Sequence, residues 1–236
     1  MDAIRFVTLD CAGTLVRVDW QPGRFATECL ESLGAVFDRG DAESTYNRIL
    51  QSRWREYQEL NLSRDESIGD GFWRELTQDW LAKIGLDAGF LEPTLELAHR
   101  RLYGDPSVAF CLYADTVPAL IALQERGVKL AVLSNWDYSL HRVLRILGLT
   151  DYFDVVVASL EEGVEKPEPR IFEVVLERLG ADPRKTLHVG DDPLDDVIGA
   201  SRAGLRSAFL DRSSPQELPK RICDLRQIIE VLDWTG

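Results

Sequence analysis

Reactive side chains stand at the ends of several short apolar segments in this sequence. A carboxylate, a hydroxyl or an amide follows each segment, and a lysine precedes one of the predicted helices. Side chains of these types can bind a cation or take part in catalysis once the fold brings them together. The residues concerned are Asp10, Ser134, Asn135, Lys166, Asp191, Asp192, Asp195 and Asp196.

The elements that must position these residues are predicted to be buried parallel strands. Short apolar, β-branched runs bounded by turn residues are typical of such strands, and they occur at residues 4–10, 128–134, 154–159, 186–190 and 206–210. Helical patterns lie between them and end at Gly127, Gly148 and Gly180. Strand–helix alternation predicts an α/β fold with a parallel sheet, and the carboxyl ends of its strands would gather the reactive residues at one edge.

A long segment without convincing strands interrupts this alternation. Apolar stripes at helical spacing predict four helices, and Asp41 is a plausible N-cap of the second. We therefore predict a core domain of residues 1–18 and 112–236 and an inserted all-helical domain of residues 19–111. Trp54, Trp73 and Trp80 are expected in the core of the insertion rather than in a ligand pocket.

Each reactive residue also has an ordinary structural explanation. An Asp after a strand often caps a turn or a helix, and Ser134-Asn135 alone would be an unremarkable turn. His188, inside a predicted strand, is expected to pack in the core. The occurrence of all these residues in order, at matching strand ends, favours a functional site.

At this point the sequence resembles the haloacid dehalogenase superfamily of hydrolases over essentially its whole length. The motifs that carry the resemblance are residues 9–15 (Leu-Asp-Cys-Ala-Gly-Thr-Leu), 133–135 (Leu-Ser-Asn), 166–172 (Lys-Pro-Glu-Pro-Arg-Ile-Phe) and 189–192 (Val-Gly-Asp-Asp) with Asp195 and Asp196. The resemblance implies a Rossmann-like core with a helical cap, phosphatase-type hydrolysis and a Mg²⁺ cofactor.

The resemblance also assigns roles to residues. Asp10 would be the nucleophile, and Mg²⁺ would be held by Asp10, the main-chain carbonyl of Ala12 and Asp191, with Asp195 and Asp196 holding metal waters or orienting Lys166. Ser134 and the N–H of Asn135 would bind the phosphoryl oxygens, and Lys166 would neutralise their charge. Thr14 would support the site behind the nucleophile, and Trp136 could flank the substrate.

The sequence departs from the family's phosphatases at residue 12. They carry an Asp there that transfers a proton, and the methyl group of Ala12 cannot. A phosphatase that uses a water or a cap residue instead is the first interpretation, and a weakly active protein that binds a phosphorylated ligand or a protein partner is the second. Carbon–phosphorus hydrolases of the family resemble this sequence in having Ala at the position of residue 12, but they also need a lysine in the cap. Lys83 is the only lysine in residues 19–111 and is therefore the only candidate. Carbon–halogen hydrolases of the family carry Tyr at the position of residue 12.

Composition narrows the classes of partner. The formal net charge of −13 makes nucleic acid an unlikely partner, and no segment has the apolar length of a membrane span. The four scattered cysteines indicate reduced thiols and a cytoplasmic location. A small phosphorylated metabolite is the expected substrate, and the sequence leaves the oligomeric state open.

Overall fold

The computed structural model describes residues 3–104, 107, 109–213 and 221–232. The chain forms two compact units, which are described separately: the core unit, Met1–Val18 with Cys111–Gly236, and the helical insertion, Asp19–Phe110. The predicted division put Cys111 in the insertion, whereas Cys111 groups with the core unit because it follows the chain back into that unit.

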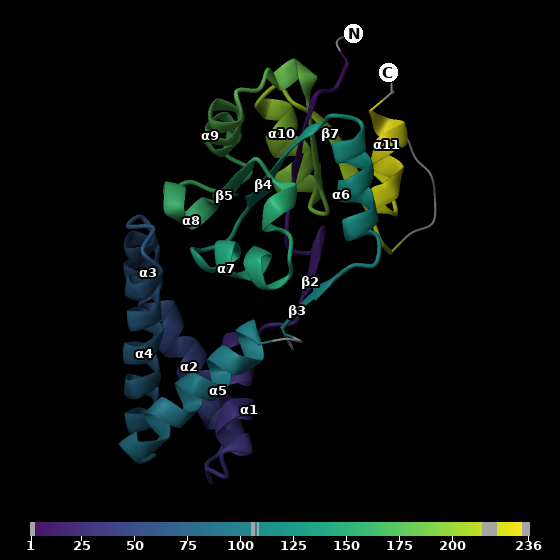
Figure 1. Cartoon of the computed structure of the whole chain (residues 1–236). Helices are drawn as coiled ribbons and strands as arrows, with labels where there is room; N and C mark the ends of the chain where they lie inside the picture. Colours follow the sequence, from purple (N-terminus) through teal and green to yellow (C-terminus); the bar gives the residue numbers. More distant parts are fainter. Residues whose placement is uncertain (1–2, 105–106, 108, 214–220, 233–236) are drawn as a thin grey trace. The chain divides into compact units, whose positions relative to one another are not determined.

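The core unit is built on a parallel sheet with strand order β5-β4-β1-β6-β7-β8 (Figure 1). The strands are β1 (Phe6–Leu9), β4 (Lys129–Ser134), β5 (Val155–Ala158), β6 (Thr186–Gly190), β7 (Arg206–Leu210) and β8 (Arg221–Ile222). The sheet confirms the predicted α/β class with a Rossmann-like parallel core. Its central strands are almost wholly buried, as their continuous apolar runs predict.

Helices cover both faces of the sheet because the strand order reverses at β1. Right-handed crossovers place α6 (Thr116–Glu125) on one face and α9 (Pro169–Leu179) on the other (Figure 1). The remaining helices of the core unit are α7 (Ser139–Ile146), α8 (Ser159–Glu162), α10 (Gly199–Arg202) and α11 (Ile228–Val231), with short helical turns at Thr150–Tyr152, Pro183–Lys185 and Leu225–Gln227 and a π-helical turn, η4, at Pro193–Ile198. In open parallel sheets, ligands bind at the carboxyl ends of the strands next to such a reversal, which here are the ends of β1, β4 and β6.

The glycines that end the predicted helices have the expected conformation. Gly127, Gly148 and Gly180 have φ of 70°, 68° and 64°, each just beyond the end of α6, α7 or α9. A left-handed residue at this position lets the chain turn away from the helix, and glycine adopts it without a steric penalty.

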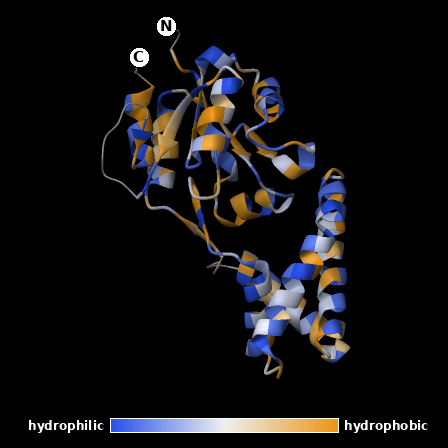
Figure 2. Cartoon of the chain, turned by 180° about the vertical axis from the view of Figure 1, so that it is seen from behind, coloured by the Kyte–Doolittle hydropathy of each residue, from blue (hydrophilic) through white to orange (hydrophobic). Residues whose placement is uncertain are grey.

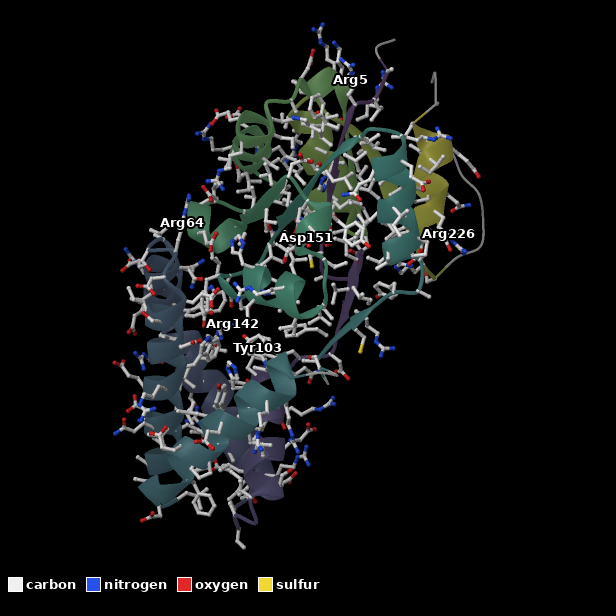
Figure 3. All side chains as sticks on the ribbon, in the orientation of Figure 1. Arg5, Arg64, Tyr103, Arg142, Asp151 and Arg226 are labelled. Carbon is white, nitrogen blue, oxygen red and sulfur yellow. The ribbon has the colours of Figure 1, made fainter. Side chains whose placement is uncertain are left out.

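The helical insertion contains five α-helices among its described residues rather than four. They are α1 (Pro22–Ser32), α2 (Arg39–Ser52), α3 (Trp54–Asn61), α4 (Glu66–Lys83) and α5 (Leu91–Tyr103), with a short turn at Ala88–Phe90. The second apolar stripe spans a break at Arg53, which divides it between α2 and α3. Arg64, with φ of 56°, lies in the turn between α3 and α4 (Figure 3).

Two predictions about the insertion need correction. The N-cap of α2 is Asp38, whose carboxylate accepts from the N–H of Asp41 at 2.8 Å, so Asp41 already lies in the first turn. Trp80 is buried and donates to the carbonyl of Ala42, but Trp54 is 42% exposed because it begins α3 directly after the break. Figure 2 shows hydrophilic and hydrophobic residues on different sides of these helices.

Three short strands escaped the sequence analysis. β2 (Val16–Val18) and β3 (Phe110–Leu112) form a two-stranded sheet where the chain leaves and re-enters the core unit, and β8 adds an edge to the main sheet. Across the described residues, no helix is long and apolar enough to cross a membrane.

Candidate active site

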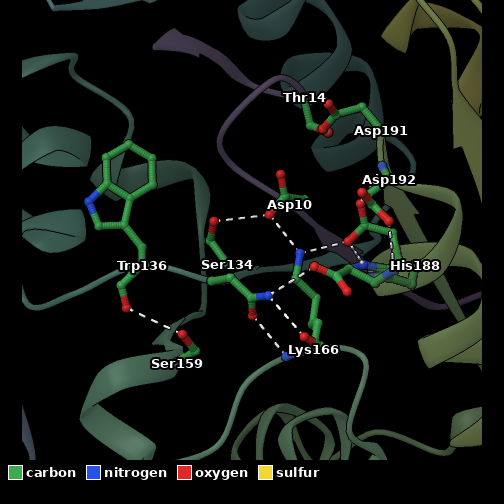
Figure 4. Close-up of polar contacts among 12 residues, drawn as sticks. Asp10, Thr14, Ser134, Trp136, Ser159, Lys166, His188, Asp191 and Asp192 are labelled. Atoms are coloured by element: carbon green, nitrogen blue, oxygen red, sulfur yellow. Dashed lines mark hydrogen bonds and ion pairs between the residues drawn. The ribbon is translucent and has the colours of Figure 1, made fainter. Parts of the chain in front are cut away.

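Asp10 lies at the carboxyl end of β1, where the sheet brings neighbouring strands together. Its N–H donates to the carbonyl of Val189, which extends the β1–β6 pairing by one residue. Its carboxylate oxygen Oδ1 accepts from Ser134 Oγ at 2.9 Å and from Lys166 Nζ at 2.7 Å (Figure 4). The structure thus brings together three residues that the sequence analysis selected from three separate segments.

Lys166 is held in place by the side chain of Asn135. The Asn135 amide oxygen accepts from the Lys166 N–H at 2.8 Å, and the amide nitrogen donates to the Lys166 carbonyl at 3.0 Å. The same nitrogen donates to Asp195 Oδ2 at 3.2 Å. The Asn135 side chain therefore positions the lysine backbone, a contact that the sequence did not reveal.

The ammonium group of Lys166 lies between two carboxylates. It donates to Asp10 at 2.7 Å and to Asp196 Oδ1 at 2.6 Å, and the residue is only 4% exposed. Burial acts to lower the pKa of Lys166, but the charges of Asp10 and Asp196 outweigh it and raise the pKa above its ordinary value. Lys166 is therefore a fixed positive charge beside Asp10 at neutral pH.

Asp191 faces Asp10 from the end of β6. Thr14 Oγ1 donates to Asp191 Oδ1 at 2.9 Å, so Thr14 supports this carboxylate from behind the Asp10 loop. Gly13 has φ of 81°, and a Cβ built on it would lie 2.2 Å from Asp191 Oδ2. Only glycine allows Asp191 to approach the loop so closely.

Burial and like charge perturb the carboxylates of this site. Burial, followed by the charge of Asp10, raises the pKa of Asp191 to about 6. Burial also raises the pKa of Asp10 against the opposing charge of Lys166. For Asp196, burial acts in the same direction, but the hydrogen bond from His188 and the charge of Lys166 outweigh it and hold its pKa below the ordinary range.

Three carboxylates have the chemistry and spacing of a divalent cation site. One oxygen each of Asp10, Asp191 and Asp196 lies within 4.8 Å of the others. Set against Lys166, three ionised carboxylates leave an excess of negative charge, and oxygen ligands are those that Mg²⁺ prefers. A divalent cation would relieve the repulsion from Asp10, which adds to the effect of burial on the pKa of Asp191, so the residues present fit Mg²⁺.

The two other acidic residues after β6 have local roles. Asp192 caps η4 by accepting from the N–H groups of Leu194 and Asp195 at 2.7 and 2.8 Å. Capping of η4 is therefore a sufficient explanation for Asp192. The carboxylate of Asp195 accepts from the side chain of Asn135.

Trp136 lies near the site, with a different partner. Its indole nitrogen donates to Ser139 Oγ at 3.0 Å, and Figure 4 shows its ring apart from the cluster around Asp10.

Two sets of positioning contacts escaped the sequence analysis. His188 is fully buried, as expected, but both ring nitrogens have polar partners, Thr8 and Asp196. A histidine in a buried strand must satisfy its ring nitrogens, which was the available signal. Arg212 donates to the carbonyls of Gly13 and Thr14, at 3.2 and 2.7 Å, and pairs with the buried Asp115.

Comparison with known proteins identifies the family of this chain. The family model for haloacid dehalogenase-like hydrolases matches residues 4–204. Haloacid dehalogenase-like hydrolase domain-containing protein 3 of Mus musculus is 29% identical over 90% of this chain and 84% of that protein. Phosphoserine phosphatase of Thermus thermophilus is 32% identical over 78% of this chain and 73% of its own length.

A solved structure shows the same fold. The 2-haloacid dehalogenase of Pseudomonas syringae matches with a TM-score of 0.66 and 24% identity, covering 97% of this chain and 98% of that one. The family model spans most of the sequence and includes Asp10, Ser134, Lys166 and Asp191. The chain therefore belongs to the haloacid dehalogenase-like hydrolases.

Proposed function

We propose that this protein is a Mg²⁺-dependent phosphatase that acts on small phosphorylated metabolites through an aspartyl-phosphate on Asp10. The observation that carries the proposal is the environment of Asp10 Oδ1, which contacts Lys166 Nζ at 2.7 Å and Ser134 Oγ at 2.9 Å. A carboxylate nucleophile beside a fixed ammonium and a hydroxyl donor suits attack on a phosphoryl group, since positioning and charge neutralisation dominate that chemistry.

In the proposed reaction, a carboxylate oxygen of Asp10 attacks phosphorus and the bond from phosphorus to the leaving oxygen breaks. Ser134 Oγ and the N–H of Asn135 hold phosphoryl oxygens, and Lys166 neutralises charge between them and Asp10. Water then attacks the phosphoryl group, which releases phosphate and regenerates the Asp10 carboxylate. Trp136 flanks the substrate.

The metal would be held by Asp10, the main-chain carbonyl of Ala12 and Asp191. Asp196, whose oxygens accept from His188, Lys166 and the N–H of Asp192, would orient Lys166 and would help to hold the hydrated metal. When bound, Mg²⁺ supplies positive charge against the phosphoryl oxygens and the nucleophile.

Ala12 determines which substrates fit this mechanism. Without a side chain that can donate a proton at this position, the leaving group must depart as a stable anion. We therefore propose substrates with good leaving groups, such as acyl phosphates. We also propose that the protein is located in the cytoplasm, where phosphorylated metabolites occur. The phosphatase relatives support the phosphorylated substrate class.

A second candidate follows from the same residue. If the methyl of Ala12 reduces turnover to a negligible rate, the protein would act as a binding module for a phosphorylated ligand or a protein partner. Carbon–phosphorus cleavage through a Schiff base is less well supported, because Lys83 is exposed in the last turn of α4 and a reactive lysine amine is activated by a desolvated pocket or a cationic neighbour.

Release of phosphate from p-nitrophenyl phosphate with Mg²⁺ separates the two candidates. We expect the wild type to turn over well above the Asp10→Asn variant, which keeps the shape of the side chain but lacks the nucleophile. Chelation of the metal should abolish this difference. Wild-type activity equal to that of Asp10→Asn, together with a large gain in Ala12→Asp, would favour the binding module.

A further inference from the structure

A continuous chain of hydrogen bonds connects the interior of the sheet to Asp10. Thr8 Oγ1 lies 2.8 Å from His188 Nδ1, and His188 Nε2 lies 3.0 Å from Asp196 Oδ1. The same Asp196 oxygen accepts from Lys166 Nζ at 2.6 Å, and Lys166 contacts Asp10 at 2.7 Å. Figure 4 shows His188 behind Lys166, on the side away from Ser134.

Strand register places Thr8 and His188 together. The two residues are direct partners in the pairing of β1 with β6, so their side chains project from the same face of the sheet. Both are fully buried. The edge of the Phe172 ring packs against the imidazole with centroids 5.2 Å apart at 89°, and this contact restricts rotation of the ring.

The partners of Asp196 determine which ring nitrogen carries the proton. Asp196 Oδ1 faces the ammonium of Lys166, and Oδ2 faces the N–H of Asp192 at 2.9 Å, and both of these groups can only donate. Asp196 therefore acts as an acceptor at both oxygens. His188 Nε2 must carry a hydrogen to bond to it, and in the neutral ring Nδ1 then accepts from the Thr8 hydroxyl.

Through this arrangement, His188 affects the position of Lys166. Asp196 Oδ1 accepts from both the imidazole N–H and the ammonium. The position of the imidazole N–H therefore affects where this oxygen lies for the ammonium. If Nε2 lost its hydrogen, its lone pair would face the carboxylate, and Asp196 would move away from the ring. Lys166 would then move relative to Asp10.

We propose that His188, with its Nε2–H directed at Asp196 and its ring held by Thr8, is a positioning residue that holds Lys166 against Asp10 through Asp196. This inference rests on the proposed function, in which Lys166 stabilises the transferring phosphoryl group. It adds Thr8 and His188 to the site as a second layer behind Asp196. Partners of this kind typically affect activity by roughly 10–100-fold when they are removed.

Paired substitutions separate positioning from simple loss of a buried hydrogen bond. Thr8→Val removes the hydroxyl that faces Nδ1, and Thr186→Val is the matched control. Thr186 lies on β6, is equally buried and donates to the carbonyl of Asp182 at 2.8 Å. Both variants lose one hydroxyl hydrogen bond, and both should lose a similar amount of stability, of the order of 1 kcal/mol.

We expect Thr8→Val to lower kcat several-fold with KM for p-nitrophenyl phosphate unchanged, and Thr186→Val to leave kcat unchanged. His188→Leu should lower kcat by roughly 10–100-fold, whereas His188→Gln, which retains an N–H donor for Asp196, should recover part of it. Equal kcat in Thr8→Val and Thr186→Val, or equal loss in His188→Gln and His188→Leu, would overturn the proposal.

A spectroscopic measurement tests the tautomer independently of turnover. The chain has three histidines, so a long-range nitrogen–proton NMR spectrum of histidine-labelled protein above neutral pH is readily assigned by substitution. His188 should show the Nε2–H tautomer in the wild type and also in Thr8→Val, because Asp196 still accepts from Nε2 in that variant. A wild-type ring protonated at Nδ1, alone or with Nε2, would overturn the assignment, even if the phosphatase activity itself were absent.

Discussion

In the proposed mechanism, the methyl group of Ala12 stands where a proton donor would serve the leaving group. Lys166, the cation beside Asp10, is held by two carboxylates and has a raised pKa, so it is poorly suited to give up a proton. The chemistry at this residue therefore depends on the substrate's own leaving group. Under the proposed function, Ala12 is the residue that most clearly separates this protein from a general phosphatase.

The rate should depend steeply on the leaving group. Across a series of aryl and acyl phosphates, we expect kcat/KM of the wild type to fall sharply as the leaving-group pKa rises. Ala12→Asp should flatten this dependence and raise the rate on poor leaving groups by roughly 10²–10⁴-fold, the usual worth of a general acid. Ala12→Asn, of similar size but unable to donate a proton in this way, should behave like the wild type. A shallow dependence in the wild type would mean that another group supplies the proton.

Single residues differ in how well the sequence predicted them. Asp10, Ser134 and Lys166 were predicted to meet because each stands at the end or entry of an element that a parallel sheet aligns. Arg212 was not predicted, because its contacts to the carbonyls of Gly13 and Thr14 depend on where the chain turns after β7. Local patterns do not contain that information.

At the scale of elements, the turn after β1 is shaped by its close approach to Asp191. Gly13 combines φ of 81° with a position where a Cβ would lie 2.2 Å from the Asp191 carboxylate. Arg212 fixes the same turn through two of its carbonyls and through Asp115, and it also lies over the Tyr113 ring at 3.7 Å. The turn is therefore fixed by its close packing against Asp191 and by its hydrogen bonds to Arg212.

Gly13→Ala should weaken metal binding much more than it weakens folding. The added methyl displaces Asp191, so we expect Mg²⁺ affinity, measured by calorimetry, to fall at least tenfold. Gly34→Ala is the matched control, because Gly34 has φ of 79° with open space around its Cβ position. Both variants share the cost of a left-handed alanine, about 1 kcal/mol. Equal Mg²⁺ affinity in the two variants would show that Asp191 does not bind the metal.

The elements themselves were predictable where burial dominates. β6 was predicted with its observed bounds, because Thr186–Gly190 is buried at every position. β2 was missed because three residues that include the exposed Arg17 carry too little pattern. The break at Arg53 was missed because the apolar stripe continues across it from α2 to α3.

At the scale of the whole molecule, a chain with a net charge of −13 places three of its carboxylates close together in its core unit. Without a bound metal, the repulsion between these carboxylates destabilises the folded state. Burial of Asp191, followed by the charge of Asp10, raises the pKa of Asp191 to about 6, against an ordinary 3.8. Because the folded state holds this proton more tightly, the contribution of Asp191 to stability falls as pH rises through that window.

Mg²⁺ should therefore stabilise the protein more strongly above about pH 6 than below it, since Asp191 must lose its proton to bind the metal. At a concentration about 100 times its Kd, the metal should add about 2.7 kcal/mol to the free energy of unfolding. Thermal unfolding with and without Mg²⁺ across this pH range measures the effect. Asp191→Asn should remove it, and a pH-independent Mg²⁺ effect would contradict this account of the site.

The central claim is that Asp10 becomes phosphorylated, and intact-protein mass spectrometry tests it most directly. The protein would be mixed with acetyl phosphate and Mg²⁺, quenched in acid and digested to locate the modification. We predict one added phosphoryl group on Asp10 that requires Mg²⁺, is absent from Asp10→Asn, and persists longer in the wild type than in Ala12→Asp. A wild type that turns over acetyl phosphate with no adduct at Asp10, or an adduct that remains in Asp10→Asn, would contradict the mechanism.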